Sequence, residues 1–296
     1  MQPAEKAAPA AVFYAGTGGE GAVTMDAQVA LGYDGSDSSR LALRWAAGYA
    51  GAARASLRII HAWIWPLFTH DVGPVKGVAD SGLRHAAEVI LAEGVDLARG
   101  ICPGLSIDPR IGAGLPAEVL RRESLEARLL VIGNRGLGTF LGKLVGSVSL
   151  DLAAACPSPL VVIRARHEEQ KPVVACVDGH LRSSKVLEQA VPVARSLQTA
   201  LRIVHVDTRP PGPGRHTPSR FHGRTVLHNA MLRVRELDPD LPVTEDLLSG
   251  EPVASALIGA GAEAELLVLG AHGAEGHPGT LVTVLTHAPC NIMIAR

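Results

Sequence analysis

The sequence predicts an α/β protein made of two tandem Rossmann-like domains, each a five-stranded parallel sheet with helices on both faces. Short apolar runs alternate with helical patterns along the chain, which is typical of parallel sheets covered on both faces. The length of 296 residues suits two domains of about 100–150 residues each. The motifs of the first half also recur in the second half, which predicts two copies of one fold.

The repeat consists of short motifs whose offset drifts along the chain. Four of them recur at offsets that fall from 144 to 132 residues: Asp34-Gly35 with Asp178-Gly179, His61 with His205, Gly133-x-x-Gly136 with Gly270-x-x-Gly273, and Cys156-Pro157 with Ala288-Pro289. A drifting offset indicates loop insertions and deletions within two copies of one domain. We therefore predict a first domain at 26–166 and a second at 171–296, after an N-terminal tail at 1–25 that we expect to be disordered.

The elements of the first domain follow from local patterns. Apolar runs predict five strands, at 29–33, 57–64, 106–113, 129–132 and 160–163. Helical periodicity predicts the intervening helices, at about 38–54, 83–101, from Pro116 onward and at 146–155. Ser38 or Ser39 is suited to cap the first of these helices, and Pro116 is suited to the first turn of the third.

A glycine motif follows the fourth predicted strand. Gly133-Asn134-Arg135-Gly136 is followed by nine residues and then by Gly146-Ser147 at the start of a helix. Glycines let the backbone approach a ligand closely, and a helix start offers unpaired N–H groups to an anion. The pattern therefore predicts a phosphate cradle, although the glycines also fit simple turns.

Asp34 ends the first predicted strand, as Gly133 ends the fourth. In parallel α/β sheets, ligands bind at the carboxyl ends of the strands, where the strand order reverses. Asp34 and Gly133 are therefore expected to share one crevice. The alternative for Asp34 is a structural role as the cap of the first helix.

Taken together, these residues resemble the universal stress protein family. The resemblance rests on Asp-Gly-Ser at 34–36, Ile-His at 60–61, Gly-x-Pro at 114–116 and the glycine motif. It covers 26–166 strongly and 171–296 more loosely. It implies the strand order 3-2-1-4-5 in each domain, and pairing of two copies through their fifth strands, here 160–163 with 291–295 of the same chain. It is also compatible with a homodimer.

The resemblance implies ATP as the ligand, with or without Mg²⁺. Asp34 would contact the adenosine and the backbone of Ala62 the adenine. The residues implied around the ribose and phosphates, with their neighbours, are Gly32, Gly133, Asn134, Arg135, Gly136, Gly146, Ser147 and Val148. Arg135 and Lys143 are suited to neutralise phosphate charge.

The second domain departs from this pattern. The corresponding residues are Asp178, Val206, Gly270, Gly273, Gly279 and Thr280. Only five residues separate Gly273 from Gly279, and Cys176 stands where the first domain has Gly32. We therefore expect nucleotide binding to be weaker there.

Composition argues against two classes of function, nucleic-acid binding and membrane insertion. A net charge of −1 and 3% aromatic residues argue against nucleic-acid binding. No stretch reaches the roughly 18 apolar residues of a membrane span, and 1–25 lacks the pattern of a signal peptide. The four cysteines form no Cys-x-x-Cys pair, which favours reduced thiols and a cytoplasmic location.

The sequence offers no catalytic set and no metal site. The glycine motif has no Walker-type lysine beside its serine and no evident general base, and His61 and His205 are expected to be structural. We therefore expect a nucleotide-dependent regulatory module of the stress response that hydrolyses ATP slowly at most. A nucleotide-independent interaction protein and a slow ATPase are the alternatives.

Overall fold

The computed structural model describes residues 28–63, 82–136, 145–167, 170–180, 183–207, 218–249, 252–271 and 278–296. The predicted tail at 1–25 lies outside this part of the chain. The elements of the first half are β1 (Gln28–Gly32), α1 (Asp37–Ala52), β2 (Ser56–Trp63), α2 (Gly82–Ile101), β3 (Ile107–Ala113), α3 (Pro116–Glu123), β4 (Leu129–Gly133), α4 (Ser147–Ala155) and β5 (Leu160–Ile163). Those of the second half are β6 (Val173–Cys176), α5 (Ser183–Ser196), β7 (Leu201–Asp207), α6 (Pro218–Leu237), β8 (Val243–Ser249), α7 (Val253–Gly261), β9 (Leu266–Gly270), α8 (Pro278–His287) and β10 (Asn291–Ala295).

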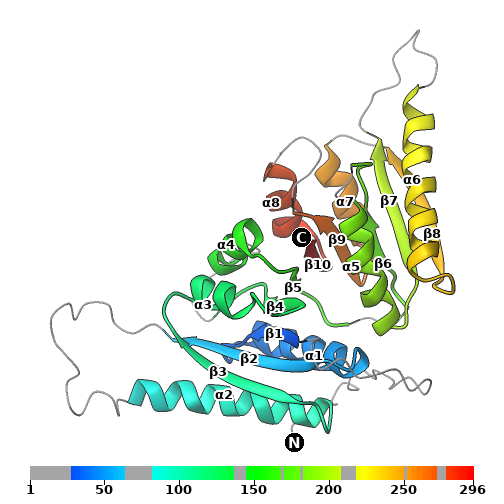
Figure 1. Cartoon of the computed structure of the whole chain (residues 1–296). Helices are drawn as coiled ribbons and strands as arrows, with labels where there is room; N and C mark the ends of the chain where they lie inside the picture. Colours follow the sequence, from blue (N-terminus) through cyan, green and yellow to red (C-terminus); the bar gives the residue numbers. More distant parts are fainter. Residues whose placement is uncertain are drawn as a thin grey trace, which may run out of the picture.

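The described strands form one ten-stranded sheet in the order β3-β2-β1-β4-β5-β10-β9-β6-β7-β8 (Figure 1). Within each half all neighbouring strands are parallel, and the order is 3-2-1-4-5. The predicted fold class and strand order are therefore confirmed. The two halves meet where β5 pairs antiparallel with β10, with Val161 opposite Met293.

Helices cover both faces of the sheet because alternate strand residues point to opposite sides. On one face, Leu31 and Val131 lie in a core that α1, α2, α5 and α6 complete. On the other face, Leu130 and Ile132 pack in a core with α3, α4, α7 and α8. β4 and β5 read as continuous apolar runs because both of their faces are buried.

The cap of α1 differs from the prediction. Ser36, not Ser38 or Ser39, is the N-cap, and its side chain accepts a hydrogen bond from the Ser39 backbone at 3.2 Å. Gly35 has a φ of +78°, a conformation that glycine adopts without strain. This turn brings Ser36 into the capping position, so α1 begins at Asp37.

Among the described helices, none is long and apolar enough to cross a membrane.

Candidate functional site

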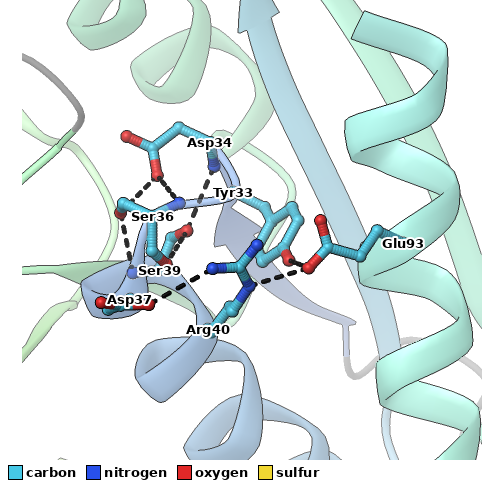
Figure 2. Close-up of polar contacts among 7 residues, drawn as sticks. All are labelled: Tyr33, Asp34, Ser36, Asp37, Ser39, Arg40 and Glu93. Carbon is cyan, nitrogen blue, oxygen red and sulfur yellow. Dashed lines mark hydrogen bonds and ion pairs between the residues drawn. The ribbon is translucent and has the colours of Figure 1, made fainter. Parts of the chain in front are cut away.

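The turn between β1 and α1 fixes the side chain of Asp34. Its Oδ1 accepts hydrogen bonds from the backbone N and the Oγ of Ser36, at 3.0 and 2.6 Å (Figure 2). Ser39 Oγ donates to the Ser36 carbonyl at 3.0 Å and accepts from the Asp34 N–H at 3.4 Å. Because Ser36 caps α1, Asp34 does not act as the helix cap, and that alternative is wrong.

The glycine turn after β4 is joined to the first turn of α1 through Ser38. Ser38 Oγ donates to Asn134 Oδ1 at 2.9 Å and accepts from the Arg135 N–H at 3.3 Å. A Cβ on Gly133 would lie 2.7 Å from the Ser38 carbonyl carbon, so only glycine lets α1 approach this closely. Ser38 was missed as a site residue because its partners lie more than ninety positions along the chain.

The same turn brings Gly136 to Asp34. A Cβ on Gly136 would lie 2.9 Å from Asp34 Oδ2, a contact that real Cβ atoms essentially never make. The first and fourth strands thus bring the predicted Asp34 and Gly136 together. β1 lies between β2 and β4, so this contact sits where the strand order reverses, as predicted for a ligand crevice.

The start of α4 closes the other side of the turn. The Gly146 N–H donates to the Asn134 carbonyl at 3.0 Å, and Ser149 Oγ donates to the Gly133 carbonyl at 3.4 Å. Gly146 is the N-cap of α4 and has no side chain to bond the amides of the first turn, so no cap from this residue covers the amides of Ser147 and Val148. Residues 137–144, with Lys143, lie outside the described part of the chain.

The remaining predicted residues of the first half lie on β1 and β2. Ala62 pairs with Gly112 of β3 at the carboxyl end of β2, beside β1. Gly32 has a packing role, since a Cβ there would lie 2.9 Å from Leu120 Cδ1. His61 Nδ1 lies 2.8 Å from the Tyr33 carbonyl.

The second half repeats the Asp-containing turn. Asp178 Oδ1 accepts from the His180 N–H at 3.0 Å and from Ser183 Oγ at 2.6 Å, as Asp34 does from Ser36. His205 Nδ1 lies 2.7 Å from the Val177 carbonyl, so the structural role predicted for both strand-end histidines is confirmed. Val206 lies in β7, the counterpart of β2.

The phosphate side of the second half differs from the first. Gly270 ends β9 as Gly133 ends β4, and Gly273 lies outside the described residues. Gly279 is inside α8, which begins at Pro278, whereas Gly146 precedes α4 as its cap. Thr280 is therefore the third residue of its helix and Ser147 the first.

A buried tyrosine connects the Asp34 turn to α2. Tyr33 Oη donates to Glu93 Oε1 at 3.2 Å, and Arg40 Nε donates to the same oxygen at 2.7 Å (Figure 2). Burial and then the Glu93 carboxylate raise the pKa of Tyr33 to about 12. Arg40 lowers the pKa of Glu93. The cluster lies on the side of the turn away from Asp34 and fixes α1 against α2. No short motif marks these three residues in the sequence.

Metal-ligating side chains do not cluster in the described ranges: no three His, Cys, Asp or Glu side chains are close enough to hold an ion. The groups that come together beyond β1 and β4 are the Asp34 carboxylate, the backbone of the glycine turn and the start of α4.

Comparison with known proteins identifies the fold. The model of the universal stress protein family matches residues 27–164 and again 170–296. The chain belongs to the universal stress protein family. A universal stress protein of Mycolicibacterium smegmatis is 28% identical over 286 residues, which span 90% of this chain and 96% of the relative. A second relative, from Mycobacterium tuberculosis, is 34% identical over 138 residues, 47% of this chain and 45% of that protein.

A solved universal stress protein from Archaeoglobus fulgidus has the same fold. It superposes with a TM-score of 0.67, and the match covers 92% of this chain and 99% of the other. The sequence identity is 17%, so this likeness describes architecture alone. The family model, which matches both halves, makes each half a copy of the universal stress protein domain.

Proposed function

We propose that the first domain of this universal stress protein binds ATP in the crevice between Asp34, the glycine turn and α4. The observation that carries the proposal is that the turn after β1, the glycine turn after β4 and the start of α4 come together around Gly136, which has no side chain. Asp34 Oδ2 faces Gly136, and the Gly146 amide is tied to the Asn134 carbonyl. A Cβ at position 136 would lie 2.9 Å from Asp34 Oδ2, so the absence of a side chain there is what lets the two segments come this close.

Each group has a chemical part in this proposal. Asp34, held by Ser36, accepts hydrogen bonds from the adenosine, and the backbone of Ala62 meets the adenine edge. The uncapped start of α4 attracts the phosphates, because helix N-termini carry unpaired N–H groups and partial positive charge. Arg135, exposed on the turn, adds a cation. When ATP carries Mg²⁺, the phosphates supply most of the ligands of the ion.

We propose that the protein binds ATP and acts as a regulatory module of the stress response in the cytoplasm. It is not proposed to hydrolyse ATP rapidly. The second domain is proposed to bind nucleotide more weakly, because Gly279 lies within α8 and does not cap it. We further propose that β5 and β10 keep the two domains paired in solution.

Calorimetric titration with ATP tests the proposal. Gly136→Ala moves the Asp34 carboxylate, since the new Cβ would lie 2.9 Å from Oδ2, and is expected to weaken ATP binding at least tenfold. Gly100→Ala is the matched control: nothing lies within 4 Å of its Cβ position on α2, so ATP binding should be unchanged. Equal affinity in Gly136→Ala and wild type would contradict the proposed site.

A further inference from the structure

Two arginines occupy the same position in the two domains, directly after the fifth strand. Arg164 follows β5 and Arg296 follows β10. They are 132 residues apart, the offset that also relates Cys156-Pro157 to Ala288-Pro289. The side chain of each reaches into the opposite domain.

Their guanidinium groups meet the carboxyl ends of two helices. Arg164 Nη2 donates to the Thr286 carbonyl of α8 at 3.1 Å, and its Nη1 donates to the Leu285 carbonyl. Arg296 Nη2 donates to the Leu152 carbonyl of α4 at 3.2 Å and also to the Ala153 carbonyl. Each domain therefore caps the last helix of the other.

The arginines donate to carbonyls in the last turn of each helix, where most carbonyls have no partner within the helix. The last four carbonyls of an α-helix have no intrahelical partner and carry partial negative charge. The backbone N–H of Cys156 satisfies the Leu152 carbonyl, and Arg296 reaches both this carbonyl and the next one. α4 has no basic residue in its own last turn, so the cation at its end comes from the second domain.

Both guanidiniums are partly buried, and burial lowers the pKa of Arg164 and of Arg296. Arginine nevertheless stays charged in proteins. A positive charge that lies partly buried against the carboxyl end of a helix stabilises the helix more than a solvent-exposed charge does. α4 is nine residues long, about 13 Å at the usual helical rise. A helix this short moves as one rigid body, so a contact that holds one end also restricts the other end.

We infer that Arg296 is a positioning residue for the ATP site of the opposite domain. The inference rests on the proposed function, since the start of α4 at Gly146 and Ser147 is the proposed phosphate side. Arg296 holds the carboxyl end of this helix and thereby fixes the amides at its start. ATP binding in the first domain is therefore coupled to the pairing of the two domains, and linkage makes this coupling reciprocal.

Three variants test the inference by calorimetric titration with ATP. Arg296→Met keeps the length of the side chain and removes its charge, and is expected to weaken ATP binding about 3- to 10-fold. Arg296→Lys returns a cation and should restore most of the affinity. Arg164→Met is the matched control: it removes the same kind of contact between the domains but uncaps α8, and should change ATP affinity less than twofold.

Two results of this titration would overturn the inference. One is wild-type affinity in Arg296→Met. The other is equal loss in Arg164→Met, which would mean that any weakening of the domain contact lowers affinity.

Hydrogen exchange without nucleotide separates this inference from the proposed function. Arg296→Met should speed amide exchange in α4 and leave α8 protected, and Arg164→Met should do the reverse. If these patterns appear while the wild type binds no ATP, the proposed function fails and the caps remain as structure alone. If α4 exchanges as in wild type, the positioning role is wrong even though ATP binds.

Discussion

The Ser38 hydroxyl is the link between α1 and the glycine turn, and its removal has a predictable effect. In Ser38→Ala the turn loses the bond to Asn134 Oδ1 at 2.9 Å and the bond from the Arg135 N–H at 3.3 Å. A typical hydrogen bond contributes about 0.5–1.5 kcal/mol net. Asn134 is half-buried and Arg135 exposed, so water replaces part of the loss.

The two bonds together therefore contribute about 1–2 kcal/mol, less a few tenths because alanine is the better helix former. For a unit of this size, 1 kcal/mol corresponds to roughly 2–4 °C in Tm, so Ser38→Ala should melt about 2–6 °C lower. ATP binding should weaken as well, because the turn that carries Gly133 and Gly136 is no longer held against α1.

Thermal unfolding with and without ATP measures both effects. Ser196→Ala is the control, because Ser196 Oγ donates only to the Pro192 carbonyl of its own helix, at 2.9 Å. Its Tm should stay within about 1–2 °C of wild type, since local surface changes cost less than 0.5 kcal/mol. If Ser38→Ala melts no lower than Ser196→Ala and gains the same stabilisation from ATP as wild type, the link does not hold the turn.

Two further predictions concern buried groups around the site. The pKa of Tyr33 is raised to about 12 in the folded state from about 10 in an unfolded chain, so the unfolded state loses its phenol proton first as the pH rises. The free energy of unfolding of wild type should therefore fall more than that of Tyr33→Phe between about pH 10 and 12. Parallel pH dependences in chemical denaturation would refute this. Gly112→Ala should destabilise the fold by about 1–3 kcal/mol, because its Cβ would lie 2.3 Å from Val119 Cγ1. Gly100→Ala, with open space around it, should stabilise by about 0.5–1 kcal/mol; equal effects in thermal unfolding would contradict the packing argument.

The fold could be predicted because its signals are local and repeated. Buried parallel strands such as β4 and β5 appear as uninterrupted apolar runs, and the two copies support each other's assignments. The convergence of Asp34 and the glycine turn that starts at Gly133 could also be predicted, because β1 and β4 have their carboxyl ends at one edge of the sheet; the close approach of Asp34 to Gly136 itself could not.

Features that depend on one turn or on distant partners could not be predicted in the same way. The cap of α1 falls on Ser36 because Gly35 adopts a positive φ, and three nearby serines fit the same local pattern. The partners of Ser38 and of Arg296 lie far along the chain, so no periodicity marks them. The repeat offset of 132 residues aligns Arg164 with Arg296. This alignment is the one sequence feature that indicates equivalent roles for the two arginines.

The nucleotide content of the purified protein tests the central claim most directly. The protein is saturated with ATP, passed through a desalting column and denatured, and the supernatant is separated by ion exchange. We predict one adenine nucleotide per chain in wild type and a much smaller amount in Gly136→Ala. Wild-type protein without nucleotide, and with no shift in Tm on addition of ATP, would contradict the account.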